Sequence, residues 1–518
     1  MGQESLQILI VMVVYMAAVI GIGIFFARRA NADTEKFFLG GRSLGPWVSA
    51  MSAEASDMSG WLLMGLPGVA YWCGLADAFW TAAGLAVGTY INWLVVSKRL
   101  RRYSIAANNA ITLPEFFSNR FHEKKKVIMG ISAAFILVFF TVYAASCLVT
   151  CGKLFSTLFG APYITMMLVG AAFVLIYTLL GGFLAESASD FMQAIVMVVV
   201  LVAVLTLGVA SAGGLNAVFE NVKDFPGFLE FFGIADPVTE CGVQLAVNGV
   251  PSFGARQNYG ALNVASMLAW GLGYFGMPQV LLRFMAIRRE DELKRARRVA
   301  MVWVVISLAA AIMIGIVGRA LFPTALTTAS EAENVFVYLS RSLLPAALAG
   351  LAMAGILAAT ISSSDSYLLI AASAFAKNAY QGIFKKNATD KEVMTLSRIM
   401  LLIITAIAIV IALDENSVIF TIVSFAWAGF GATFGPLVLF SLFWKRMTRA
   451  GAIAGMLSGG GMVFIWKLVI KPLGGIFGIY ELLPAFIVSS IFIIAVSLLT
   501  SAPSKEIQDE FERVKKGA

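Results

Sequence analysis

The chain of 518 residues is 59% hydrophobic and only 13% charged, whereas soluble domains are about 45–50% apolar and about 25% charged. This composition excludes an ordinary soluble protein and predicts an all-α integral membrane protein, because a stretch of about 20 apolar residues crosses a bilayer as a helix. The formal net charge of +8 requires no nucleic-acid partner, since an excess of Lys and Arg is typical of cytoplasmic loops.

Apolar stretches predict about thirteen membrane helices. Their approximate ranges are 6–27, 45–73, 76–97, 127–153, 161–183, 190–213, 261–286, 299–322, 342–376, 396–414, 417–444, 449–470 and 482–500. The first is too long for a cleavable signal and lacks a basic start. An odd number of crossings places the two termini on opposite sides of the membrane.

Basic residues gather in one set of loops between these helices. Most of the 38 Lys and Arg residues belong to this set, including Arg283 and the runs 98–102, 124–126 and 288–298. The positive-inside rule assigns these loops to the cytoplasm, where they could also contact anionic lipid. We therefore expect a multi-pass protein of the cell membrane with its N-terminus outside and its C-terminus in the cytoplasm.

Two of the predicted helices contain segments that interrupt a helix. The sequence SAEASDMSG occupies 52–60 in the second helix, and WGLGYFGMP occupies 270–278 in the seventh. Gly weakens a helix, and Pro removes a hydrogen bond while clashing with the preceding turn. In lipid such a break persists only where the freed groups face protein, water or a ligand. For either segment alone, the alternative is that Gly and Pro serve helix packing.

The positions of the two breaks predict an internal repeat. Helices two to six and seven to eleven form two sets of five, and each set begins with a broken helix. Because five is odd, the two sets have opposite orientations, as in inverted-repeat transporters that bind substrate and ions at unwound midpoints. The predicted divisions are 1–44 (first helix and loop), 45–213 (first repeat), 214–260 (extracellular segment), 261–444 (second repeat), 445–502 (two further helices) and 503–518 (cytoplasmic tail).

Carboxylates inside the predicted helices point to a cation or proton site. A charge at the bilayer centre costs roughly 2.5–3.5 kcal/mol on insertion scales, so it needs a partner or a function. Asp57 lies in the first break, Glu54 is three residues earlier, Asp365 follows a run of three serines, and Asp190 opens the sixth helix. We expect no Lys or Arg in these helix interiors, and oxygen ligands without a fixed counter-charge suit a hard cation or a proton.

Each of these residues also has a structural explanation. Asp190 could be a helix N-terminal residue favoured by the dipole, and Glu54 and Asp365 could lie in a water-filled vestibule. The serines at 362–364 could bond to their own helical turn, although a run of three beside an acid favours ligands. No CxxC pair or cluster of His and Cys suggests a metal or redox centre, and no nucleophile–base pair suggests an enzyme.

These residues resemble those of the sodium/solute symporter family, and within it the sodium/proline symporters most closely. The specific segments are GGRSLGP at 40–46, SDMSGWLLMGLPG at 56–68, FFTVY at 139–143, WGLGYFGMP at 270–278 and AWAGFG at 426–431. The resemblance runs from about residue 37 to the last helix. It implies a LeuT-type core of five plus five helices, with one extra helix before it and two after it.

The resemblance also assigns roles to individual residues. It implies that sodium is bound by Ala55, Met58, Ala359, Ser362 and Ser363. It implies that Asp57 is needed for sodium coupling, that Arg42 contributes to coupling at the cytoplasmic side, and that Asp190 lies near a second sodium site. The implied proline-binding residues are Ser59, Gly60, Tyr143, Trp270, Tyr274 and Pro278. For each aromatic residue alone, ordinary helix packing is the alternative.

Three features depart from the family pattern. Glu54 replaces a small residue, Asp365 stands where a neutral hydroxyl residue is usual, and the segment at 214–260 is long. We therefore expect Glu54 to affect coupling and expect Asp190 and Asp365 to form a second cation or proton site.

The expected function is symport of sodium and a small amino acid, above all L-proline, into the cell by alternating access. The alternatives are sodium- or proton-coupled transport of another amino acid, a monocarboxylate or pantothenate, and a sensor built on a transporter scaffold. We expect sodium as the coupling ion, no organic cofactor, no enzymatic activity, no obligatory protein partner, and contact with the lipid bilayer.

Overall fold

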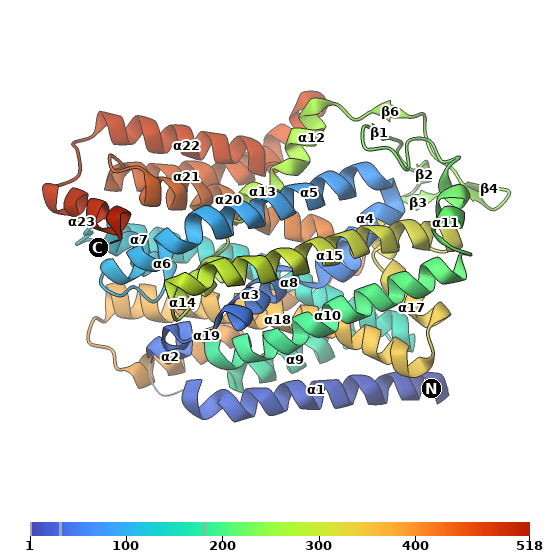
Figure 1. Ribbon diagram of the computed structural model, residues 1–518, viewed down its shortest axis with the longest axis horizontal. Coiled ribbons are helices and arrows are strands. Elements are labelled where there is room, and N and C mark those ends of the chain that lie inside the picture. Colours follow the sequence, from blue (N-terminus) through green and yellow to red (C-terminus); the bar gives the residue numbers. More distant parts are fainter. Residues whose placement is uncertain (1–2, 31–33, 181, 518) are drawn as a thin grey trace.

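The computed structural model describes residues 3–30, 34–180 and 182–517, and nearly all of their regular structure is helical (Figure 1). Within this part of the chain, ten helices are long and apolar enough to cross a membrane. Three shorter apolar helical segments lie at Trp61–Cys73, Tyr163–Leu179 and Ala261–Gly273. The all-helical membrane fold is confirmed, and the total of about thirteen crossings stays a prediction.

The elements follow one another in two groups, separated by a segment with short strands. The first group consists of α1 (Gln3–Ala30), α2 (Thr34–Leu39), α3 (Pro46–Asp57), α4 (Leu66–Cys73), α5 (Leu75–Ile91), α6 (Ser97–Ala106), α7 (Leu113–Arg120), α8 (Val127–Phe159), α9 (Tyr163–Leu180) and α10 (Phe183–Ser211). The second group consists of α12 (Ala261–Leu268), α13 (Trp270–Gly273), α14 (Pro278–Ala286), α15 (Leu293–Leu321), α16 (Ala329–Ala332), α17 (Val335–Leu343), α18 (Ala346–Ser373), α19 (Asp390–Ile411), α20 (Ile419–Phe443), α21 (Arg449–Ile465), α22 (Leu482–Leu499) and α23 (Lys505–Lys516).

Both predicted interruptions are present as breaks in helices. The first interrupted crossing consists of α3, a gap at Met58, a π-helical turn at Trp61–Gly65, and α4. The second consists of α12, α13 and α14, with Met277 in an extended conformation directly before the proline that begins α14. Since α3 packs against α10, α14, α15 and α18, and α13 packs against α5 and α20, both breaks lie inside the bundle.

The remaining crossings surround this core. The first helix, α1, packs against α10 and α18, and the last two crossings, α21 and α22, pack against each other and against α20. They occupy the places expected of one extra helix before the core and two after it. The first residue of α1 and the C-terminal helix α23 lie at opposite ends of the molecule (Figure 1).

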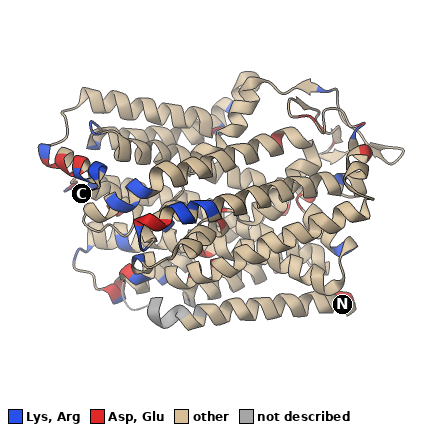
Figure 2. Ribbon diagram, in the orientation of Figure 1, with Lys and Arg blue, Asp and Glu red and all other residues tan. Residues whose placement is uncertain are grey.

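The polar segment between the two groups forms a small layer at one end of the molecule (Figure 1). It contains α11 (Leu215–Val222) and six two-residue strands, β1 (Gly233–Ile234), β2 (Thr239–Glu240), β3 (Val243–Gln244), β4 (Ala246–Val247), β5 (Val250–Pro251) and β6 (Gln257–Asn258). The strands pair antiparallel as β1–β6, β2–β3 and β4–β5. The segment lies at the end away from the C-terminus, whereas Lys and Arg gather at the C-terminal end (Figure 2).

Two helices begin earlier than hydropathy predicts. The predicted start of the sixth crossing at 190 is wrong, because α10 begins at Phe183. The residues before 190 include Glu186, whose charge made this stretch look like a loop that ends at Asp190. The eighth crossing was predicted to begin at 299, but α15 begins at Leu293 and carries arginines in its first turns.

Candidate functional site

The two breaks meet at Asp57. The hydroxyl of Tyr274, in the second break, donates a 2.8 Å hydrogen bond to Oδ2 of Asp57. Nε2 of Gln279, in the first turn of α14, donates to Oδ1 at 3.3 Å. All three side chains are buried, with at most 1% of each exposed. The segments predicted to interrupt their helices therefore join through a carboxylate in the middle of the bundle.

Local sequence explains why the chain departs from a helix here. Met58 follows α3 with φ −87° and ψ 76°, outside the helical region. The backbone then passes so close to α8 that a Cβ on Gly60 would lie 2.5 Å from the side chain of Thr150. In the second break, a Cβ on Gly273 would lie 2.0 Å from Nε1 of Trp427. Glycine is therefore required at both positions by close packing.

Aromatic rings enclose the same region. The ring of Trp270 stacks on Tyr480, with centroids 5.0 Å apart, and lies 6.3 Å from Trp61 of the first break. The indole of Trp427 donates a 2.8 Å hydrogen bond to the carbonyl oxygen of Trp270 and packs edge-on against Tyr274. The apolar lining and the buried carboxylate suit a small molecule that carries both an apolar part and a charge.

The structure places the other expected substrate residues around this point. The hydroxyl of Tyr143 donates to the carbonyl oxygen of Asp57 at 3.5 Å, and its ring stacks on Tyr367 at 4.2 Å. Ser59 lies in the first break, and its buried hydroxyl has no hydrogen-bond partner among the described residues. Pro278 begins α14 directly after the second break and is buried there.

Four of the five expected sodium residues are in direct contact. Oγ of Ser362 and Oγ of Ser363 donate to the carbonyl oxygen of Ala55 at 2.8 and 3.3 Å. Ser362 Oγ also lies 3.2 Å from the carbonyl oxygen of Ala359. Met58, the fifth, directly follows the end of α3. Carbonyl and hydroxyl oxygens from α3 and α18 thus converge, and such oxygens are the ligands that hard cations prefer.

A buried arginine occupies the interior near the sodium residues. Arg283 of α14 has no exposed side-chain surface and pairs with Glu186, and its Nη2 lies 3.2 Å from Oδ2 of Asp190. Its Nε donates to Oγ of Ser52 at 3.0 Å, and that hydroxyl donates to Asp190 at 2.7 Å. The expectation that no Lys or Arg lies among these acids is therefore wrong. Arg283 belongs to the helix interior and not to the basic loops, because Glu186 and Asp190 compensate its charge.

Asp365 joins this cluster at its edge. The backbone N–H of Ser366 donates to its Oδ1 at 2.8 Å, and the side chain of Ser366 donates to Glu186. Its Oδ2 is buried and has no hydrogen-bond partner among the described residues. The side chain lines a cavity of about 10 Å³ with Tyr177, Thr178, Gly182, Glu186 and Leu369. Asp190 and Asp365 therefore lie around one guanidinium, and Asp365 retains an oxygen free to bind.

Glu54 lies on the side of α3 that faces Trp93, in the helical segment Asn92–Val96 that follows α5. Nε1 of Trp93 donates to its Oε1 at 3.1 Å, whereas its Oε2 is buried without a partner among the described residues. Asn92, beside Trp93, donates a 2.9 Å hydrogen bond to the carbonyl oxygen of Tyr274 in the second break. Glu54 is thus connected to the helix segment that supports the breaks, and water does not reach it.

Arg42 lies far from this centre, at the basic end of the molecule. Its guanidinium donates to the carbonyl oxygens of Met285 and Ala110 at 2.7 and 2.8 Å and to Oγ of Ser104 at 3.0 Å. Burial and the neighbouring Arg101 lower the pKa of Arg42 to about 10, so it stays charged at neutral pH. It ties the loop before α3 to the end of α14 and to α6.

Sequence reasoning missed several members of the site. They are Trp61, Glu186, Gln279, Arg283, Tyr367 and Trp427. A helical spacing of four could have found two pairs, because Gln279 and Arg283 share one face of α14 and Glu186 and Asp190 share one face of α10. The aromatic residues carried no such signal, since rings in membrane helices usually serve packing.

Comparisons with solved structures support the architecture. A Na⁺-coupled sialic acid symporter in a substrate-bound outward-open state aligns with 96% of this chain and 99% of its own, with a TM-score of 0.76 at 16% identity. A nucleobase-cation-symport-1 family transporter in a closed conformation aligns with 92% of this chain and 98% of its own, with a TM-score of 0.51 at 12% identity. At these identities the likeness establishes the fold alone, which is the predicted LeuT-type arrangement.

Sequence comparisons establish the family. The sodium/proline symporter of Haemophilus influenzae is 43% identical, covering 98% of this chain and 97% of the relative, and that of Escherichia coli is 40% identical over 98% and 96%. The high-affinity proline transporter of Bacillus subtilis is 40% identical over 94% and 97%. A model of the sodium:solute symporter family matches residues 37–459. The chain belongs to the sodium:solute symporter family, whose members are transporters and not enzymes.

Proposed function

We propose that this protein moves L-proline into the cell together with sodium by alternating access. The observation that carries the proposal is the junction of the two broken helices at Asp57, where Tyr274 and Gln279 meet one carboxylate. The two breaks lie beside a cluster of aromatic rings formed by Trp61, Trp270 and Trp427. The relatives named above, about 40% identical over nearly their full length, are described as proline transporters.

The proposed sodium ion binds among Ala55, Met58, Ala359, Ser362 and Ser363. Two serine hydroxyls already point at the carbonyl oxygen of Ala55, so a cation placed between them would draw α3 and α18 together. Asp57 supplies negative charge directly after this stretch of α3. The membrane potential would add about 2.3 kcal/mol per elementary charge per 100 mV to the driving force.

The proposed proline site lies between the two breaks. The secondary ammonium group of proline can pair with the carboxylate of Asp57. It can also lie against the faces of Trp270 and Tyr143, since aromatic faces attract cations. The carboxylate of proline is proposed to bind at Ser59 and Gly60, where a helix starts. The buried hydroxyl of Ser59, which has no partner among the described residues, is one donor there. Tyr274 and Pro278 bound the apolar ring.

Coupling follows from the shared use of α3. Sodium fixes the end of α3 against α18, and the same end carries Asp57, Ser59 and Gly60 toward the substrate. Sodium binding therefore raises the affinity for proline, and proline raises the affinity for sodium by the same factor. Glu54 and Arg42 are proposed to influence this coupling, Glu54 through Trp93 and Arg42 by holding the loop before α3.

We also propose a second cation or proton site at Asp190 and Asp365. The support is the buried, unpartnered Oδ2 of Asp365 beside Glu186 and Asp190. Arg283 compensates part of the negative charge, which favours a single proton or monovalent ion over a divalent one. Replacing Asp365 with Ser should lower the sodium Hill coefficient or remove a pH dependence of uptake. Unchanged values of both would refute the second site.

The proposed orientation follows the charge distribution. The end that carries most Lys and Arg (Figure 2) is assigned to the cytoplasm by the positive-inside rule. The C-terminal helix α23 then lies inside, the first residues of α1 lie outside, and the strand-containing segment before α12 is extracellular. Cysteine accessibility at Cys241, which is exposed in that segment, checks this assignment: an impermeant thiol reagent should label it from outside intact cells.

The direct test uses purified protein in liposomes. An inward sodium gradient should drive uptake of labelled proline, and an equal potassium gradient or a proton gradient alone should not. A tenfold excess of unlabelled alanine, pantothenate or pyruvate should leave the uptake of proline nearly unchanged. Uptake driven by protons, or inhibited equally by another solute, would contradict the proposed coupling ion or substrate.

A further inference from the structure

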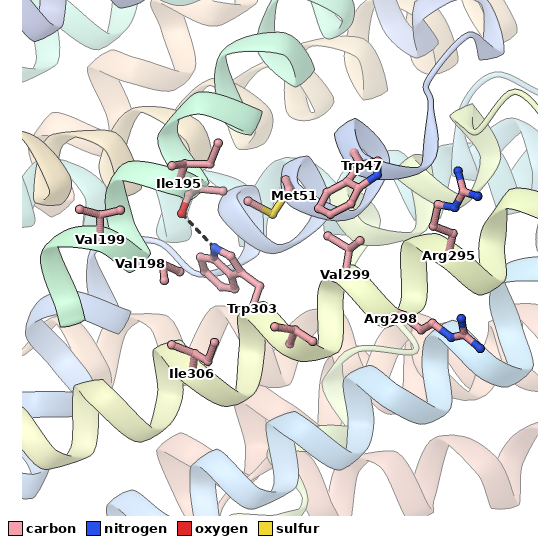
Figure 3. A pocket seen from close by; sticks show the side chains of 12 residues that line it. Trp47, Met51, Ile195, Val198, Val199, Arg295, Arg298, Val299, Trp303 and Ile306 are labelled. Carbon is pink, nitrogen blue, oxygen red and sulfur yellow. Dashed lines mark hydrogen bonds between the residues drawn. The ribbon is translucent and has the colours of Figure 1, made fainter.

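A groove runs along the outside of the bundle where α3, α10 and α15 meet. It has a volume of about 630 Å³ (Figure 3). It is lined by Trp47 and Met51 of α3, by Ala194, Ile195, Val198 and Val199 of α10, and by Arg295, Arg298, Val299, Val302, Trp303 and Ile306 of α15. This groove is separate from the junction at Asp57, and neither the family nor the proposed transport reaction gives it a role.

The walls of the groove are apolar and open to the membrane. Val302 is 62% exposed and Val199 is 51% exposed. The floor is fixed, because Trp303 is buried and its Nε1 donates a 2.9 Å hydrogen bond to the carbonyl oxygen of Ala194 (Figure 3). From Arg295 to Ile306 the lining extends about 16 Å along α15, from the helical rise per residue. That length matches half of a hydrocarbon core about 30 Å thick, which is the depth of one leaflet.

One end of the groove is basic. Arg295 and Arg298 both lie at that end, with their side chains turned to different sides (Figure 3), and both are exposed. Within the part of the chain that the structure describes, neither forms an ion pair. Two other arginines nearby do have partners: Arg288 pairs with Glu292, and Arg297 lies over the ring of Tyr90. Two uncompensated cations therefore stand where an apolar slot reaches the basic end of the molecule.

Trp47 adds a third feature at the same level. It lies near the start of α3, is 55% exposed, and lines the groove beside the arginines (Figure 3). Tryptophan is enriched at the level of lipid headgroups, where one side of its ring is apolar and its N–H faces polar groups. The groove thus has an apolar slot one leaflet deep, an interfacial aromatic ring, and a site for an anion at its mouth.

We propose that this groove binds an anionic glycerophospholipid from the leaflet at the basic end. One acyl chain fills the slot between α10 and α15, and the phosphate lies at the end of the groove that Arg295 and Arg298 line. Charge complementarity selects a lipid over a second protein helix, whose apolar face would leave both guanidinium groups uncompensated. It also selects an anionic headgroup over a zwitterionic one, which brings no net charge to the pair.

The lipid would contact α3, which is the half of the broken helix that precedes the gap at Met58. Trp47 and Met51 belong to that half, and the same helix ends at Asp57. An acyl chain in the groove therefore packs against the helix that carries Asp57. The lipid would therefore lie where α3 packs against α10 and α15.

Native mass spectrometry of the purified full-length protein tests the proposal. The protein in detergent receives equal amounts of phosphatidylglycerol or phosphatidylcholine, and the fraction that retains one lipid is measured. The wild type should retain phosphatidylglycerol in preference to phosphatidylcholine. In the double variant R295Q/R298Q, the fraction of protein that retains phosphatidylglycerol should be about tenfold lower. The variant V302W, which keeps both charges and fills the slot, should lower this fraction to a similar extent.

The matched control removes the same charge from another exposed part of the basic end. Lys124 and Lys125 are exposed and line none of this groove, so K124Q/K125Q should change retention less than twofold. Equal retention of the two lipids by the wild type would overturn the proposal. So would unchanged retention in R295Q/R298Q or in V302W. A wild-type dimer that V302W separates, with lipid retention unaffected, would identify a second copy as the occupant instead.

Discussion

Tyr274 and Asp57 are 217 positions apart in the chain, yet the tyrosine hydroxyl donates a 2.8 Å hydrogen bond to the aspartate carboxylate. Each residue belongs to a different broken helix, and both are buried. The bond therefore joins the two halves of the repeat at one charged group. Any ligand that changes the position of Asp57 also acts on the second break, which gives sodium and substrate a common element.

Replacing Tyr274 with Phe tests this contact. A hydrogen bond to a charged group contributes about 1.5–3 kcal/mol, so we expect the apparent affinity for sodium to fall roughly 10- to 100-fold in uptake assays. Tyr90→Phe is the control, because Tyr90 lies exposed on α5. The loss of its hydroxyl should leave the apparent affinity for sodium unchanged. Unaltered sodium dependence in the Tyr274 variant would show that the bond has no part in coupling.

The serines of α18 offer a comparison between neighbouring hydroxyls. Ser362 points at Ala55 of α3, whereas Ser364 bonds to Thr360 of its own helix at 2.6 Å. We expect Ser362→Ala to raise the sodium concentration for half-maximal uptake about tenfold, a change of about 1.4 kcal/mol, while Ser364→Ala leaves it within twofold. Equal effects of the two substitutions, measured over a sodium titration, would argue against a sodium site at this position.

Arg283 should be essential for stability. Removing it leaves Glu186 and Asp190 buried without a cation, and breaking a buried pair on one side costs about 3–5 kcal/mol. We expect Arg283→Gln to lower the thermal unfolding midpoint in detergent by many degrees. The double variant R283Q/E186Q should recover part of the loss because it removes one uncompensated charge.

The control for this series is Arg289→Gln. Arg289 pairs with Asp291 at an exposed position, where ion pairs contribute about 0–1 kcal/mol. Its midpoint should match the wild type. If R283Q matched it as well, the buried cluster would not stabilise the bundle.

The close packing at the second break predicts a strong effect of a single methyl group. A Cβ at Gly273 would overlap the indole of Trp427, whereas a Cβ at Gly461 would meet nothing within 4 Å. We expect Gly273→Ala to reduce proline uptake more than tenfold, because Trp427 must leave its bond to Trp270. Gly461→Ala should transport normally. Binding and uptake assays at equal protein levels make the comparison, and normal uptake by both variants would refute it.

The breaks could be predicted from sequence because their cause is local. Gly60, Gly273 and Pro278 interrupt a helix through backbone properties that the sequence displays directly, and Asp57 is conspicuous among apolar residues. The family resemblance gave Asp57 and Tyr274 separate roles, and only the structure shows that the two residues are hydrogen-bonded. Gln279 escaped notice because an amide in a helix has many ordinary partners, and only the packed structure identifies the one it meets.

Arg283 shows the limit of reading charge from sequence. Near the end of an apolar stretch, an arginine looks like part of a basic loop. Its true place depends on Glu186 and Asp190, which lie almost a hundred residues away and themselves looked like the polar start of a helix. Charges that compensate one another across distant helices are misassigned together, which also explains why α10 begins earlier than hydropathy predicts.

Sodium and proline are proposed to bind to one shared element of the protein, the end of α3. The most direct measurement is the dissociation constant of labelled proline on purified protein over a series of sodium concentrations, for the wild type and for the double variant S362A/S363A. We expect sodium to tighten proline binding at least tenfold in the wild type and to have little effect in the variant. Proline bound equally tightly with and without sodium by the wild type would contradict it.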